Sequence, residues 1–154
     1  MSAWPDSEAV TVRLLEHADL DRVMGIERSC YPFPWTRGIF VDCLRVGYCC
    51  TALQAARELV GYSVMSFGPG EAHLLNICID PECQRQGYGS FLLEQMIGQA
   101  RHAGAEMLYL EVRPSNTAAI EMYHQRGFHM IGTRPNYYPA VMGREDARLM
   151  ALQL

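Results

Sequence analysis

Long apolar runs are absent from this sequence, and none approaches the roughly 18 residues that a membrane-spanning helix requires. Residues 1–9 form a polar leader that lacks the charged-then-apolar order of a secretory signal. Basic residues are few, with 13 arginines and no lysine against 17 acidic residues and a formal net charge of −4. Because nucleic-acid affinity depends on clustered basic side chains, this balance argues against direct nucleic-acid binding and favours a basic protein partner. We expect a cytoplasmic protein without membrane contact.

The sequence also lacks the spacings that are typical of metal sites and of acyl-enzyme catalysts. Its six cysteines form no C-x-x-C pair and its five histidines belong to no close ligand pair, so we expect buried free thiols and no metal. No G-x-S-x-G elbow is present and no cysteine has an evident paired base, which disfavours a covalent acyl intermediate. Repeats and low-complexity segments are missing too, and 154 residues with 49% hydrophobic content predict a single domain, residues 1–154.

Hydrophobic periodicity predicts a mixed α/β fold. Strands are expected at residues 10–15, 48–54, 59–67, 72–79, 107–112, 128–134 and 147–154, and helices at residues 18–28, 36–45, 90–103 and 117–126. Two prolines make a rigid aromatic loop of residues 31–35, and Tyr137 and Tyr138 are expected in a loop between the last two strands. The strand-helix-strand order in the middle of the chain implies one parallel strand pair, whereas both ends favour antiparallel pairing.

The hexapeptide Gln84-Arg85-Gln86-Gly87-Tyr88-Gly89 lies between a predicted strand and a predicted helix. Its glycines allow a sharp turn, and unpaired N–H groups at a helix start favour an anion such as a pyrophosphate. The dinucleotide fingerprint and the P-loop sequence are both absent. Two glycines at a helix start are as often a purely structural turn as an anion site, so both interpretations stay open on this feature alone.

Three polar side chains in the last third of the chain are candidates for chemistry. Glu111 lies at the carboxyl end of a predicted strand, where ligands of open α/β sheets bind, although it is also suited to be a solvated carboxylate or a partner of Arg113. Tyr123 is either a core aromatic or a phenol whose hydroxyl reaches a cleft. Asn116 is equally suited to cap the helix that follows it and to contact a ligand.

The hexapeptide resembles the acetyl-coenzyme A signature of the GNAT acetyltransferase superfamily. Further segments resemble the ribosomal-protein-alanine N-acetyltransferase family, the RimI type, within it. These segments are Phe33-Pro34-Trp35, Leu75-Asn76-Ile77, residues 110–116, Tyr123 with Gly127-Phe128, Asn136-Tyr137-Tyr138-Pro139 and Gly143-Arg144-Glu145-Asp146-Ala147. The resemblance covers nearly the whole chain, from about Val10 to Leu154.

This resemblance implies a GNAT fold, that is, a mixed and mostly antiparallel sheet with a central splayed parallel strand pair and flanking helices. It implies direct acetyl transfer from acetyl-coenzyme A, without a metal, to the N-terminal alanine of small-subunit ribosomal protein eighteen. Glu111 matches the general base and Tyr123 the general acid. The residues implied in cofactor binding are Ile77, Cys78, Ile79, Arg85, Gln86, Gly87, Tyr88, Gly89, Ser90 and Asn116, and those implied in acceptor binding are Phe33, Trp35, Tyr137 and Tyr138.

Two other functions remain open at the level of the sequence. One is a GNAT acetyltransferase for other protein N-termini, lysine side chains or a small amine, and the other is a noncatalytic module that senses acetyl-coenzyme A. The presence of both Glu111 and Tyr123 argues against the second. Tyr31 stands where relatives often carry a histidine, which leaves the finer acceptor preference open, and the sequence leaves the oligomeric state open as well.

Overall fold

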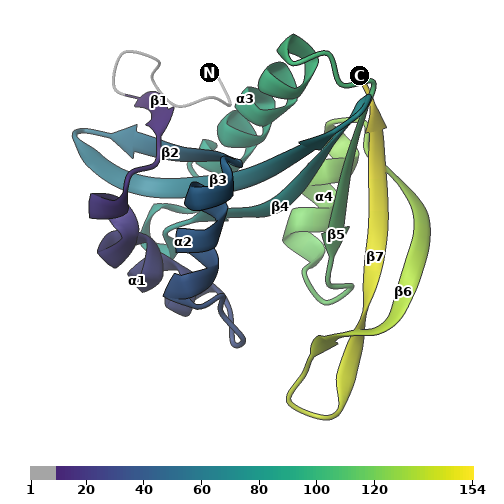
Figure 1. Ribbon diagram of the computed structural model, residues 1–154. Coiled ribbons are helices and arrows are strands. Elements are labelled where there is room, and N and C mark those ends of the chain that lie inside the picture. The colour runs from purple at the N-terminus through teal and green to yellow at the C-terminus, as the bar shows by residue number, and fades with distance from the viewer. Residues whose placement is uncertain (1–9) are drawn as a thin grey trace.

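The structure is a computed structural model that describes residues 10–154 (Figure 1). The leader at residues 1–9 lies outside the described residues. The elements in chain order are β1 (Val10–Leu14), η1 (His17–Asp19), α1 (Leu20–Cys30), α2 (Arg37–Val46), β2 (Cys49–Ala55), β3 (Glu58–Gly68), β4 (Glu71–Ile79), η2 (Pro81–Cys83), α3 (Tyr88–His102), β5 (Met107–Val112), α4 (Thr117–Gln125), β6 (His129–Pro139) and β7 (Arg144–Gln153). No helix within these residues is long and apolar enough to cross a membrane.

All the strands of residues 10–154 belong to one seven-stranded sheet in the order β1-β2-β3-β4-β5-β7-β6. Every neighbouring pair is antiparallel except β4 and β5, which pair in parallel from Glu71 opposite Met107 to Leu74 opposite Leu110. Beyond these residues the two strands diverge, and Figure 1 shows the gap that opens between them. The predicted mixed sheet with a splayed parallel pair is therefore confirmed.

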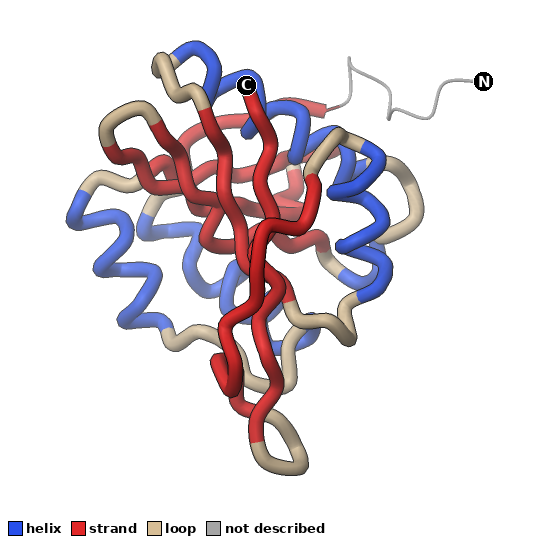
Figure 2. Tube along the Cα trace, turned by 90° about the vertical axis from the view of Figure 1, so that its right-hand side faces the viewer, coloured by secondary structure: helices blue, strands red, loops and turns tan. Residues whose placement is uncertain are grey.

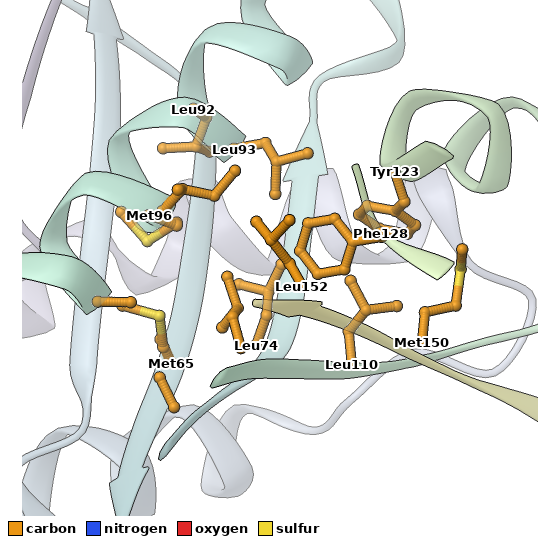
Figure 3. Close-up of a cluster of buried hydrophobic side chains, with 14 of the residues drawn as sticks. Met65, Leu74, Leu92, Leu93, Met96, Leu110, Tyr123, Phe128, Met150 and Leu152 are labelled. Carbon is orange, nitrogen blue, oxygen red and sulfur yellow. The ribbon is translucent and has the colours of Figure 1, made fainter. Parts of the chain in front are cut away.

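Helices cover both faces of the sheet, as Figure 2 shows. On one face, α1 and α2 pack on a core that includes Phe40 and Tyr62, whose rings meet edge to face with centroids 5.6 Å apart. On the other face, α3 and α4 pack on a larger core, part of which Figure 3 shows around Leu93 and Leu110. The gap between β4 and β5 therefore opens toward a helical layer on each side.

Several boundaries differ from the sequence-based prediction, and two of the differences affect the site. Helix α3 begins at Tyr88 and not at residue 90, because Gly87 adopts a left-handed φ of 86° that lets the helix begin directly after it. Tyr137 and Tyr138 lie in strand β6, so the prediction that they lie in a loop is wrong. The strand continues because Asn136, with a φ of 54°, makes an irregularity after which pairing with β7 resumes at Tyr138 opposite Glu145.

A partly buried ion pair holds the start of α1 to Asp80, the residue that follows β4. Arg22 donates a hydrogen bond to the carboxylate of Asp80, which also accepts one from the N–H of Glu82 at 3.0 Å. Burial raises the pKa of Asp80, but the hydrogen bonds from Glu82 and Arg22 and the charge of Arg22 outweigh burial, so the net pKa lies below its ordinary value. Asp80 therefore stabilises the fold most when it is ionised.

This depressed pKa predicts acid sensitivity. The contribution of Asp80 to stability is present above about pH 4, the ordinary pKa of an aspartate, and is lost as the pH falls toward the lower pKa of the folded state. We expect Asp80→Asn to be less stable than the wild type at pH 7 and to lose less of its unfolding free energy between pH 4 and pH 2. Urea unfolding curves across this range measure the difference, and parallel pH profiles for the two proteins would contradict it.

Candidate active site

A cavity of about 750 Å³ lies where β4 and β5 diverge. Its walls come from α1, the loop after α1, β4, β5, α4 and the β6–β7 hairpin. The predicted site residues that line it are Phe33, Trp35, Ile77, Glu111, Asn116, Tyr123, Tyr137 and Tyr138. The tertiary structure thus brings together both predicted catalytic residues and all four predicted acceptor residues, although these positions span more than a hundred residues of sequence.

Glu111 points into this cavity because β5 alternates. Leu108, Leu110 and Val112 are buried on the α3–α4 face, so Glu111 lies on the opposite face, where its side chain is 12% exposed. Its Oε1 atom lies 3.7 Å from His73 Nε2. The suggestion that Glu111 serves as a partner of Arg113 is wrong.

Glu111 has a second basic side chain nearby, and Arg113 has a different carboxylate as its partner. Glu111 Oε1 lies 3.6 Å from Arg134 Nη2, while Arg113 forms its ion pair with Glu145 at 3.1 Å. The hydroxyl of Tyr137 hydrogen-bonds Glu111, and this bond, followed by burial, raises the pKa of Tyr137. Glu111 is therefore held by polar contacts on the cavity wall.

Tyr123 combines both roles that its position on α4 suggests. Its ring packs against Phe128 with centroids 5.6 Å apart, and the residue is 5% exposed within the core drawn in Figure 3. It also lines the cavity, and its hydroxyl has no hydrogen-bond partner among residues 10–154. Burial, and then the nearby Tyr138, raise the pKa of Tyr123 above the ordinary value for a phenol. The group is therefore a protonated phenol that is free to donate a hydrogen bond into the cavity.

The edge of β4 that faces the gap presents backbone groups from alternate residues. The carbonyl of Ile77 accepts a hydrogen bond from the Tyr31 hydroxyl at 3.0 Å, and that of Ile79 accepts one from Gln84 Nε2 at 3.0 Å. In a strand the N–H and C=O of one residue point to the same side, so the N–H groups of Ile77 and Ile79 also point toward the gap. The backbone N–H and C=O of Cys78 point toward β3, where Cys78 lies opposite Tyr62, and its thiol side chain is buried on the α1–α2 side of the sheet.

The corner between β4 and α3 offers a cluster of backbone donors. Arg85 and Gly87 adopt left-handed φ values of 64° and 86°, and no side chain caps the start of α3. The N–H groups of Tyr88, Gly89 and Ser90 belong to the first turn, where a helix offers them no internal partner. A Cβ atom on Gly89 would lie 3.4 Å from Met122 Sδ, so α4 packs closely on this corner. Residues 85–90 lie outside the lining of the 750 Å³ cavity and form a separate donor cluster.

Arg113 links the two sides of the cavity mouth. Its guanidinium lies 4.4 Å from the ring centroid of Tyr138 and 5.7 Å from that of Phe33, and it donates a hydrogen bond to the carbonyl of Pro139 at 2.7 Å. The sequence analysis gave Arg113 no role beyond a possible partner for Glu111. Its position directly after a strand-end carboxylate was the available signal, but the aromatic partners lie far away in the sequence.

Asn116 both caps α4 and lines the cavity. Its Oδ1 atom accepts a hydrogen bond from the N–H of Ala119 at 3.3 Å. We expect Asn116→Ala to lower the unfolding free energy by about 1 kcal/mol, because the helix loses its cap, whereas Asn116→Ser retains a capping oxygen and most of the stability. Chemical denaturation of the three proteins measures this, and equal losses in the alanine and serine variants would show that the cap is not what matters.

A sequence profile of the acetyltransferase (GNAT) family matches residues 20–128. This chain belongs to the GNAT acetyltransferase family. It is 39% identical to the ribosomal protein bS18-alanine N-acetyltransferase of Escherichia coli K12 over 144 residues, which cover 94% of this chain and 97% of that protein. The predicted relationship to the ribosomal-protein-alanine N-acetyltransferases is therefore confirmed, as is the prediction of an acyltransferase.

Solved structures agree with this placement. The crystal structure of the Escherichia coli ribosomal-protein-S18-alanine N-acetyltransferase superimposes with a TM-score of 0.87, covering 94% of this chain and 93% of that one. Ard1 from Thermoplasma volcanium, at 27% identity, superimposes with a TM-score of 0.86 over 95% of this GNAT chain and 98% of its own. YncA from Salmonella typhimurium, solved with acetyl-coenzyme A, has the same fold at 21% identity and a TM-score of 0.78, over 95% and 94% of the two chains. Acetyl-coenzyme A is the co-substrate of this family.

Proposed function

We propose that this GNAT enzyme transfers the acetyl group of acetyl-coenzyme A to the N-terminal alanine of ribosomal protein bS18. The observation that carries the proposal is the 39% identity to the bS18-alanine enzyme across 94% of the chain. The cavity supports it, because a carboxylate and a free phenol lie between aromatic walls of a size suited to a peptide end. A ribosomal protein is a basic acceptor, which suits a chain of net charge −4, and such an acceptor places the reaction in the cytoplasm.

The residues fit acetyl-coenzyme A at two places. The bare N–H groups at the start of α3, together with Arg85, suit the pyrophosphate. The edge of β4 suits the pantetheine arm, since the N–H groups of Ile77 and Ile79 point into the gap. The acetyl thioester would then end at the cavity, near Glu111 and Tyr123. Cys78 turns its backbone toward β3, so we assign the contacts on this strand to its two neighbours.

The proposed chemistry follows from the ionisation of the reacting groups. An α-amino group has a pKa of about 8 and must lose a proton before its nitrogen can attack the thioester carbon. Glu111 accepts that proton directly or through a water molecule. When the C–S bond breaks, the sulfur leaves with the electron pair, and Tyr123 donates a hydrogen bond to it. The ammonium group loses two protons in forming the amide, of which one ends on the thiol and one reaches solvent.

Tyr123→Phe tests the role of the phenol. We expect kcat to fall by about tenfold to hundredfold, which is the effect of losing one hydrogen bond to a charged group, with little change in the affinity for acetyl-coenzyme A. Thermal stability should stay the same, because the hydroxyl has no protein partner within residues 10–154. Steady-state kinetics and a melting curve measure both quantities, and an unchanged kcat would remove Tyr123 from the acid role.

The substrate itself is tested by mass spectrometry. The enzyme is incubated with isotopically labelled acetyl-coenzyme A and a mixture of small-subunit ribosomal proteins, and label on the N-terminal alanine of bS18 alone is expected. Label on many N-termini or on lysines would show a broader acetyltransferase. Tight acetyl-coenzyme A binding without any labelled product, over a wide range of amines, would favour the noncatalytic sensor.

A further inference from the structure

A second carboxylate lines the same cavity, and nothing above assigns it a role. Glu27 lies on the inner face of α1, is 1% exposed, and interrupts an otherwise apolar stripe. Its Oε1 atom accepts hydrogen bonds from the Tyr62 hydroxyl at 2.6 Å and from Asn76 Nδ2 at 3.0 Å, and its Oε2 atom accepts one from the N–H of Trp35 at 2.8 Å. The carboxylate is therefore fixed between α1, the loop after it, β3 and β4.

Glu27 differs from Glu111 in its partners. Within residues 10–154, every donor to Glu27 is neutral, and no Lys, Arg or His side chain forms an ion pair with it. Glu111 has both His73 and Arg134 within 4 Å. A buried carboxylate without a cation is costly, because desolvation disfavours the charged form and nothing of opposite charge offsets it. The structure thus contains a buried negative group that lacks a counter-charge.

The hydrogen-bonding capacity of Glu27 is not exhausted. A carboxylate offers about four acceptor positions, two on each oxygen. The Tyr62 hydroxyl and the Asn76 amide occupy both positions on Oε1, whereas the N–H of Trp35 occupies only one on Oε2. One acceptor position therefore remains on a carboxylate that borders the cavity. A donor that also carries positive charge would satisfy both the open position and the missing counter-charge.

We propose that Glu27 binds the ammonium group of the acceptor through Oε2, directly or through one water molecule. The inference rests on the proposed function, because the acceptor amine must enter this cavity. The inference assigns amine binding and proton removal to two different carboxylates on the same face of the sheet. Glu27 captures the charged amine, which is the dominant form near pH 7, and Glu111 then removes its proton. Glu27 is in this sense a residue that determines specificity for a cationic acceptor.

The division predicts a distinct kinetic pattern for Glu27→Gln. Loss of a charge-assisted hydrogen bond to the bound ammonium should raise KM for the peptide by about tenfold to hundredfold. The value of kcat should change little, because the nitrogen regains positive charge as it attacks, so the carboxylate binds the ground state and the transition state alike, and the loss of such uniform binding raises KM alone. The affinity for acetyl-coenzyme A should stay unchanged, since the hydrogen-bond donors to Glu27 are Trp35, Tyr62 and Asn76 and none of them is a predicted cofactor residue.

A binding experiment separates charge recognition from a structural role. Two peptides are compared that differ only at the first residue, which is alanine in one and propanoyl, lacking the amine, in the other. Calorimetry is done with coenzyme A in place of acetyl-coenzyme A, so that no transfer occurs. The wild type should bind the alanine peptide at least about tenfold more tightly, and this preference should vanish in Glu27→Gln. A role in holding the Trp35 loop alone would weaken both peptides equally and would overturn the inference.

Two controls keep the test decisive. Tyr62→Phe removes one donor to Glu27 but keeps its charge, so the preference for the amine should persist in this variant. Glu111→Gln should also keep the preference, and this measurement decides the question if Glu27→Gln does not fold. Loss of the preference in Glu111→Gln would assign ammonium binding to Glu111 and overturn the inference.

Failure of the proposed function is recognised separately. It appears as a wild-type enzyme that does not acetylate the alanine peptide in the mass-spectrometric assay. The same calorimetric comparison is then made with the amine that the assay identifies and its counterpart without the amine. If Glu27→Gln keeps the preference for that amine, the inference fails in that setting too.

Discussion

Glu111→Gln is expected to lower kcat by about 10² to 10⁴, the usual contribution of a positioned general base, while the affinity for acetyl-coenzyme A stays the same. The amide has nearly the shape of the carboxylate but cannot accept a proton at neutral pH. The residue lines the acceptor cavity on the face opposite to Leu108 and Leu110, so its replacement leaves the core intact. Steady-state kinetics across a pH range and calorimetry with coenzyme A measure the two quantities.

The control for Glu111→Gln is the same substitution at a glutamate next to the same strand. Glu106→Gln makes the identical substitution at an exposed residue next to the start of β5, outside the residues that line the cavity. It should leave kcat, the pH profile and stability at wild-type values. Glu111 would lose the base role if its glutamine variant kept the wild-type pH–rate profile, or if the two glutamine variants were equally active.

Gly61→Ala is expected to lower the unfolding free energy by about 3 kcal/mol, the cost of forcing a methyl group into a packed interior. Gly61 lies on β3 opposite Ile79, and an added Cβ would come within 2.8 Å of the Cys78 carbonyl oxygen and 2.5 Å of Ile79 Cδ1. The carbonyl belongs to the backbone and cannot rotate away, so β4 must move. Because β4 provides the edge proposed for pantetheine, KM for acetyl-coenzyme A should rise as well.

A second glycine provides the comparison for Gly61. Gly98 is exposed on α3, and a Cβ there would meet no atom within 4 Å. Gly98→Ala should therefore stabilise the protein by about 0.5 to 1 kcal/mol, because alanine loses less conformational freedom than glycine in a helix. Urea denaturation of the two variants measures the contrast. If Gly61→Ala were as stable as the wild type, the close contact between β3 and β4 would not be a constraint.

The expected effects have a common origin in the divergence of β4 from β5. Where the strands stop pairing after Leu74 and Leu110, β4 keeps an edge of unpaired backbone and β5 carries the carboxylate of Glu111. Gly61 acts on this arrangement from the β3 side by allowing the close approach of β4, and Glu27 acts on it from α1. Catalysis in the proposed mechanism therefore depends on a break in the sheet, and one missing side chain, at Gly61, and one buried carboxylate, Glu27, lie next to it.

Parts of the fold and site were predictable because they depend on local chemistry. The alternation in residues 107–112 placed Glu111 opposite to a buried face, since side chains in a strand alternate whatever its neighbours are. Gly87 marked the sharp corner, since its φ of 86° favours glycine. A helix was expected from residue 36, and Thr36 caps α2, because its Oγ1 atom accepts a hydrogen bond from the N–H of Ile39 at 3.3 Å.

Other features were out of reach for sequence reasoning. Tyr137 and Tyr138 look like loop residues beside Pro139, and only the pairing of β6 with β7 makes them part of a strand. Glu27 lies at a core-facing position of a helix that the pattern identified, yet its charge had no visible explanation there. Its partners Tyr62 and Asn76 lie 35 and 49 residues away.

By itself the sequence determined the strand and helix types, the turn at the glycine corner and the family, because each of these is carried by residue types at fixed short spacings. Only the tertiary structure decided that β4 and β5 separate after four paired residues, that Cys78 faces β3 while its neighbours face the gap, and that Glu27 and Glu111 border one cavity. These features depend on strand register and on packing between distant segments. A one-residue change in register reverses the side to which every group in a strand points, and no local pattern specifies that choice.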